Sequence, residues 1–278
     1  AVRAVVAAVR RGVRLDRIAV LHASPEPYAR LAHEQLHAAG IATNGAAVLP
    51  LAARLAGRTL LELLALPEGG FRRQDVLAWL SSAPILLEGR WAPVSAWERI
   101  SREAAVVAGR RDWDVLLDRF ADQQERRAAA AEADDDQPEW VEARARDLAE
   151  RARSLRRFVL RVADDLADAA SSPRRWSEHA RWAQRWLVDL LGPADRRQGW
   201  PELERKAAER VEQALERLAA LDPVEGAAPL EVFARTLAVE LEGDLGRVGR
   251  LGEGVLVGSV EMGVGLDLDL VVVLGLAE

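Results

Sequence analysis

Short apolar runs at the two ends of the chain predict the strands of one sheet. Residues 17–21 form one run near the N-terminus, and residues 255–260 and 270–274 form two more in the tail. None of them alternates with polar residues, so we expect strands buried on both faces, as in a parallel sheet covered by helices. Two strands do not make a stable sheet, so the tail runs need the N-terminal run as a partner.

A strand–helix–strand unit is predicted at the N-terminal end. Residues 28–39 repeat apolar positions with helical spacing and stop at Gly40, and residues 41–45 form a second extended segment that ends on an Asn44-Gly45 turn signal. Strand, helix and strand in this order predict a βαβ-like unit with a right-handed crossover.

The middle of the chain is predicted to consist of consecutive helices. Apolar residues recur every three or four positions, and proline, glycine and aspartate separate the segments. The predicted helices cover residues 49–66, 72–81, 94–107, 112–133, 139–170, 174–191, 202–221 and 230–242, after a first helix at 1–11. We therefore predict an α/β domain made by residues 1–50 and 251–278, split by an all-α insertion at residues 51–250.

Five glycines lead from the last predicted helix to the tail strands. They precede a strand instead of following one, and no helix comes after them, so the pattern favours a linker over a phosphate-binding loop. The glycines are Gly243, Gly246, Gly249, Gly252 and Gly254.

Composition excludes several classes of protein. The 278 residues contain no cysteine, which excludes disulfides, thiolate metal sites and a cysteine nucleophile. The single lysine, Lys206, has no glycine beside it, so the phosphate-binding loop of nucleotide hydrolases is absent. A net charge of −6 leaves only a local basic face for nucleic acid. No apolar run is long enough to cross a membrane, and we expect a cytoplasmic location and no membrane partner.

Histidines and paired carboxylates are the candidate metal and acid–base groups. His33 and His37 have the i, i+4 spacing of metal ligands, but no third ligand is evident, so two solvated helix histidines are the favoured interpretation and no metal is predicted. Asp164 and Asp165 lie in a polar helix and are expected to be solvated. Asp267 and a second aspartate, Asp269, lie in the tail turn, where a carboxylate could touch a ligand.

Arginines and tryptophans cluster on two predicted helices. The arginines along residues 139–170 form either a solvated helix with i, i+4 ion pairs or a ridge that contacts phosphates. Trp182 and Trp186 are either core residues, which we favour, or platforms on which bases stack. The four arginines that share one side of their helix are Arg153, Arg156, Arg157 and Arg161.

The two ends of the chain resemble the C-terminal half of a superfamily 1 DNA helicase. The segment from Ile18 through His22 to Gly40-Ile41 is similar to motif IV of that family, and the tail from Ser259 is similar to motif V. Arg usually stands at the position of His22, and Thr, His, Lys and Glu usually stand in motif V at the positions of Ser259, Glu261, Val264 and Asp267. With these departures the pattern resembles the RecB- and AddB-like helicase-nucleases more than UvrD itself.

The resemblance implies an α/β fold of the RecA-like type, a nucleotide hydrolase domain without the phosphate loop, split by a helical insertion. By the resemblance, Gly265 and Asp267 would face the nucleotide, and single-stranded or duplex DNA would be contacted by His22, Ser259, Glu261, Met262, Arg153 and Arg157. No catalytic residue is assigned to the chain.

The expected protein is part of an ATP-dependent DNA helicase or helicase-nuclease of repair and recombination, with hydrolase and exonuclease activity in the whole enzyme. ATP and Mg²⁺ would belong to the full-length protein, whose P-loop domain would lie upstream, while motif VI would lie beyond Glu278. The fragment alone is expected to bind no cofactor and to hydrolyse no ATP. A partner helicase-nuclease subunit is a further expectation. The alternatives are a non-catalytic helicase-like scaffold that binds DNA or a partner, and a helical interaction module without a DNA role.

Overall fold

The computed structural model of the chain describes residues 1–25, 27–46, 49–134, 136–243, 245–248 and 252–276. Its contacts divide it into two compact units. The sheet unit comprises residues 1–54, 201–210 and 241–278, and the helical unit comprises residues 55–200 and 211–240. Of the residues discussed above, Gly249 and Glu278 lie outside the described ranges.

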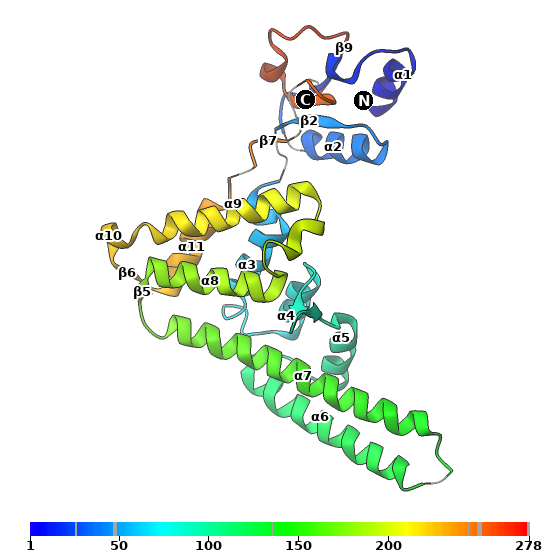
Figure 1. Cartoon of the computed structure of the whole chain (residues 1–278), viewed down its shortest axis with the longest axis vertical. Coiled ribbons are helices and arrows are strands. Elements are labelled where there is room, and N and C mark those ends of the chain that lie inside the picture. The colour runs from blue at the N-terminus through cyan, green and yellow to red at the C-terminus, as the bar shows by residue number, and fades with distance from the viewer. Residues whose placement is uncertain (26, 47–48, 135, 244, 249–251, 277–278) are drawn as a thin grey trace. The chain divides into compact units, whose positions relative to one another are not determined.

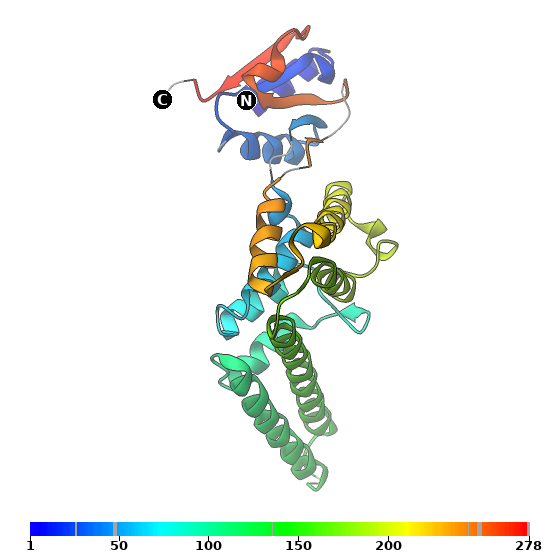
Figure 2. The same ribbon diagram turned by 90° about the vertical axis from the view of Figure 1, so that its left-hand side faces the viewer.

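Four parallel strands form the sheet unit's centre, and this confirms the α/β class. They are β1 (Ile18–His22), β2 (Thr43–Ala46), β8 (Val255–Ser259) and β9 (Leu270–Leu274), in the order β2-β8-β1-β9. The N-terminal strand β1 therefore pairs with both tail strands, as predicted (Figures 1 and 2). β8 lies between β1 and β2, so the two strands of the βαβ-like unit are not neighbours.

A short strand that the apolar pattern did not predict joins the edge of the sheet. β7 (Arg247–Val248) lies within the glycine-rich return segment and pairs antiparallel with β2. Backbone bonds also join the two chain segments beside the insertion, because Leu51 N–H donates to the Gly243 carbonyl at 2.9 Å and Ala52 N–H donates to the Leu241 carbonyl at 2.8 Å.

Helices α1 (Val2–Arg10) and α2 (Tyr28–Ala38) cover one face of the sheet. Their buried side chains, Val5 and Leu36 among them, pack on Ile18, Val20 and Val257. The other face carries a smaller cluster of Ala19, Leu21 and Leu256, covered by Met262 and Leu268.

The prediction that every strand is buried on both faces is confirmed for β1 and wrong for β9. All five residues of β1 are buried. In β9, Val271 and Val273 are 46% and 36% exposed, while Leu270, Val272 and Leu274 pack on the helix-covered side. β9 is an edge strand, and only one of its faces is covered by helices.

The helical unit is built mostly from helices with the predicted positions. α7 (Glu139–Ala170) has the predicted bounds, whereas the predicted helix at residues 49–66 is divided into a 3₁₀ turn, Leu51–Ala53, and α3 (Leu55–Ala65). The other helices are α4 (Arg73–Ser81), α5 (Val94–Glu103), α6 (Gly109–Glu132), α8 (Trp176–Leu191), α9 (Glu202–Ala219, shared with the sheet unit), α10 (Asp222–Glu225) and α11 (Leu230–Glu240). The unit also contains two short antiparallel strand pairs. They are β3 (Leu86–Leu87) with β4 (Arg90–Trp91) and β5 (Arg174–Arg175) with β6 (Ala227–Ala228).

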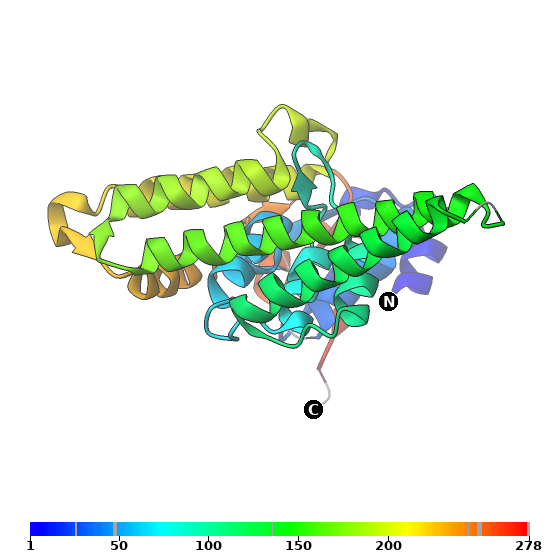
Figure 3. The same cartoon turned by 90° about the horizontal axis from the view of Figure 1, so that it is seen from below.

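Helices α6 and α7 form an antiparallel hairpin and lie side by side in Figures 1 and 3. The buried residues of α7 recur at alternating spacings of three and four, the pattern of a coiled-coil seam. They include Ala152, Leu155, Val159, Val162 and Leu166. At the base of the hairpin, Phe158 lies against Trp79 and Trp97 with ring centroids 6.0 and 5.4 Å apart, which fixes α4, α5 and α7 together.

Candidate nucleic-acid interface

The carboxyl edge of the sheet brings residues from both ends of the chain together. His22 is the last residue of β1 and stands in register with Ser259 on β8 and Leu274 on β9. In open parallel α/β sheets, ligands bind outside the carboxyl ends of the strands. His22 and Ser259, both predicted to contact DNA, therefore lie at the edge where such a ligand would bind.

A 3₁₀ turn, Val260–Gly263, follows Ser259 at this edge and folds back on the sheet. The turn packs closely on β1, because an added Cβ at Gly263 would lie 2.6 Å from Leu21 Cδ1. Met262 packs on the cluster that contains Leu21, so its side chain mainly covers the sheet. Glu261 is exposed, and its carboxylate adds a negative charge where the resemblance expects a phosphate.

His22 is buried, with only 6% of its surface exposed. Its Nδ1 has no hydrogen-bond partner among the described residues. Burial lowers the pKa of His22 below its ordinary value, so the imidazole is neutral near pH 7. A neutral imidazole makes a weaker phosphate contact than an arginine does.

Asp267 lies at the opposite, amino edge of the sheet. Arg17 precedes β1 and binds two aspartates that precede β9: Nε donates to Asp269 Oδ2 at 2.7 Å, Nη2 to Asp269 Oδ1 at 3.0 Å, and Nη1 to Asp267 Oδ2 at 2.9 Å. The Asp269 N–H also donates to the Arg17 carbonyl at 2.8 Å. We call these three residues the Arg17 clamp.

Hydrogen bonds within the clamp shift the pKa values of Arg17 and Asp269. Hydrogen bonding to Arg17 holds the pKa of Asp269 below its ordinary value of 3.8, and the two carboxylates raise the pKa of Arg17. The hydrogen bonds of the clamp fix the turn between the tail strands to β1.

The structure sets Asp267, predicted to face the nucleotide, apart from His22, predicted to contact DNA. β1 has five residues that advance about 3.3 Å each, so its two ends lie about 13 Å apart. Gly265, whose φ of +76° suits glycine, belongs to the turn that leads to Asp267 at the amino edge. Asp267 is bonded to Arg17 Nη1, while its side chain stays exposed.

The arginines of the predicted phosphate ridge have carboxylate partners. Arg153 donates to Glu125 of α6 at 2.6 Å, and Arg157 donates to Glu150 of α7 at 2.9 Å. The remaining two, Arg156 and Arg161, pair with Asp114 and Asp189. The ion-paired interpretation holds for this ridge, and the pairs mostly join one helix to another instead of following the i, i+4 pattern.

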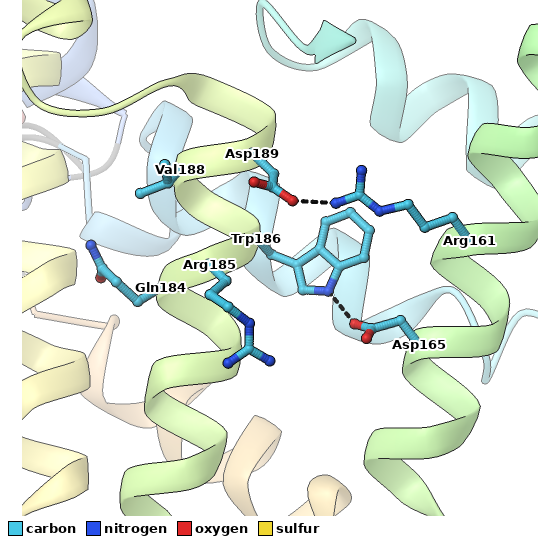
Figure 4. A pocket seen from close by; sticks show the side chains of 7 residues that line it. All are labelled: Arg161, Asp165, Gln184, Arg185, Trp186, Val188 and Asp189. Atoms are coloured by element: carbon cyan, nitrogen blue, oxygen red, sulfur yellow. Dashed lines mark hydrogen bonds and ion pairs between the residues drawn. The ribbon is translucent and has the colours of Figure 1, made fainter. Parts of the chain in front are cut away.

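Asp165 has a structural role that the sequence did not predict. Its Oδ2 accepts a hydrogen bond from Trp182 Nε1 at 2.6 Å. It also accepts one from Trp186 Nε1 at 2.5 Å, as Figure 4 shows. Both indoles are buried, which confirms the core interpretation, and the expectation that Asp165 is solvated is wrong. The guanidinium of Arg161 lies 4.9 Å from the centre of the Trp186 ring and pairs with Asp189 in the same view. These side chains help to line a pocket of about 290 Å³, in which Arg161 pairs with Asp189 and Asp165 accepts from the indoles.

No group of three or more His, Cys, Asp or Glu side chains in the described part of the chain could hold a metal ion. Both histidines were predicted to be solvated, and this is wrong for His33, which is half-buried with its Nδ1 3.2 Å from Thr43 Oγ1. His37 is exposed. No helix of the described residues is long and apolar enough to cross a membrane.

No protein-family model matches the chain, and no curated protein is significantly similar to it.

Proposed function

We propose that the sheet unit is a RecA-like motor domain of a DNA helicase or helicase-nuclease, and that its carboxyl edge contacts single-stranded DNA. The observation that supports this most is the register of β8 on β1, which sets Ser259 beside His22 although they come from opposite ends of the chain. A parallel sheet interrupted by a long helical insertion between β2 and β8 is the arrangement that the resemblance implies.

The chemistry of this edge suits a weak contact to the DNA backbone. The Ser259 hydroxyl can donate one hydrogen bond to a phosphate oxygen, a contact that positions a strand without reading its bases. Exposed Glu261 and the neutral His22 add no positive charge. In the whole enzyme, ATP and Mg²⁺ would be held with the help of other domains, and we assign no nucleotide-binding step to the residues of this unit.

A second candidate is favoured by the Arg17 clamp. Asp267 stands where the resemblance expects a group for the nucleotide ribose, yet it is bonded to Arg17 at the amino edge. A helicase-like subunit without ATP use, which binds DNA or a partner subunit as a scaffold, would have this arrangement. The two candidates differ in ATP turnover by the whole protein.

Two substitutions at opposite edges of the sheet test the proposed DNA contact. Ser259→Ala should weaken the binding of a labelled 20-nucleotide oligothymidylate about fivefold, the effect of losing one hydrogen bond of about 1 kcal/mol. Asp267→Asn, which changes the amino edge, should leave the affinity unchanged. The reverse pattern would contradict the placement of DNA at the carboxyl edge. Residues 1–278 alone should show no DNA-stimulated ATP turnover. Detection of such turnover would show that these residues contain a complete nucleotide site.

A further inference from the structure

Three arginines around a pocket of the helical unit have no ionic partner among the described residues. The pocket has a volume of about 590 Å³ and is lined by residues of α5, α6 and α7 and of the connection between α6 and α7. Arg99 of α5, Arg127 of α6 and Arg144 of α7 line it, and no described residue forms a hydrogen bond or ion pair with any of them. Glu103 is the one acidic side chain in the lining, so the described lining is net positive.

Neighbouring carboxylates do not neutralise these arginines, because other arginines bind them. Arg146 pairs with both Glu132 and Glu142, and Arg153 pairs with Glu125. These carboxylates thus pair with arginines outside the pocket lining, and no described carboxylate pairs with Arg99, Arg127 or Arg144. This contrasts with the ridge on α7, whose four arginines are all paired.

An aromatic ring and a buried amide complete the lining. Trp140, in the first turn of α7, is 63% exposed, which is unusual for a residue of this size. Gln124 of α6 is 7% exposed, and its Oε1 is buried without a hydrogen-bond partner among the described residues. A buried acceptor without a donor costs free energy, so a ligand with an N–H group would relieve this cost.

We propose that this pocket binds a nucleotide unit of single-stranded nucleic acid. The base stacks on the Trp140 ring and offers an N–H group to Gln124 Oε1, and the flanking phosphates meet Arg99, Arg127 and Arg144. Aromatic stacking combined with a basic groove is how proteins hold single strands without strong sequence preference. This site is separate from the carboxyl edge of the sheet unit and goes beyond the proposed function.

The chain provides a matched control for each part of the pocket. Arg102, Arg119 and Arg126 are exposed arginines on α5 and α6 that do not line the pocket. Trp91 on β4 is 63% exposed, as Trp140 is. The test variants are therefore R99A/R127A/R144A and Trp140→Ala, and the controls are R102A/R119A/R126A and Trp91→Ala.

Fluorescence anisotropy of a labelled 20-nucleotide oligothymidylate, at several NaCl concentrations, measures the binding. Trp140→Ala should weaken binding at least fivefold, while Trp91→Ala should not. The slope of log K against log salt should become shallower by about 2 in R99A/R127A/R144A, since each lost phosphate contact to a single strand contributes about 0.7. The control triple variant should keep the slope of the original protein.

Equal behaviour of test and control variants would overturn the proposal, since general charge would then explain the binding. Displacement of the DNA by a poly-glutamate peptide, with Trp140→Ala without effect, would also overturn it and assign the pocket to an acidic peptide. A loss caused by Ser259→Ala but not by the pocket variants would leave the proposed function standing and remove this site. Unchanged circular dichroism of each variant shows that the fold is kept.

Discussion

Removing the carboxylate of Asp165 should destabilise the helical unit. Asp165 Oδ2 accepts from two indole N–H groups at 2.6 and 2.5 Å, and Trp182 and Trp186 are 2% and 4% exposed. In Asp165→Ala both indole N–H groups lose this acceptor. A hydrogen bond to a charged group contributes about 1.5–3 kcal/mol, and the two bonds share one oxygen, so we expect a loss of about 3 kcal/mol in the free energy of unfolding.

Intrinsic tryptophan fluorescence measures the unfolding of the helical unit alone. All nine tryptophans of the chain belong to that unit, whereas the single tyrosine, Tyr28, lies in the sheet unit. With a urea m-value of about 2 kcal/mol/M, the unfolding midpoint should fall by about 1.5 M. Asp164→Ala is the matched control, because Asp164 is exposed and pairs at the surface with Arg110. Similar midpoints for the two variants would refute the reasoning, since Asp165 would then contribute no more than a surface carboxylate.

Two further predictions concern the sheet unit. Gly263→Ala should speed the hydrogen exchange of β1 amides, because the new Cβ would lie 2.6 Å from Leu21 Cδ1 and overpacking of this kind costs about 1–3 kcal/mol; unchanged exchange would show that Leu21 moves aside freely. The Arg17 clamp should stabilise the fold at neutral pH and be lost in acid: its hydrogen bonds lower the pKa of Asp269, so the contribution is fully present above the ordinary value of 3.8 and disappears as the pH falls through the lower folded pKa. Acid unfolding of Asp269→Asn beside the original protein checks this, and the two should converge at the lowest pH.

The helices could be predicted from the sequence because their signal is local. The apolar spacing in residues 139–170 is sufficient to place α7 within its observed bounds. The pairing of β1 with the tail strands followed from the apolar runs, since each tail strand needed a partner. β7 has two residues, and its backbone pairing with β2 leaves no apolar pattern to detect.

Long-range partners explain what the sequence could not show. Asp164 and Asp165 are adjacent in the same helix, and only the packing of α8 separates a surface carboxylate from one that binds two indoles. The Arg17 clamp depends on the register of β9 on β1, which sets Asp269 beside Arg17 at the amino edge. Which arginines of the hairpin are paired likewise depends on α6 facing α7.

Hydrogen–deuterium exchange with and without single-stranded DNA tests the central claim most directly. A saturating 20-nucleotide oligothymidylate should slow the exchange of amides near His22 and at residues 259–263, which share the carboxyl edge. Amides at residues 267–269, fixed to Arg17 at the amino edge, should exchange as before. Protection at residues 267–269 with none near His22 and Ser259 would contradict the account.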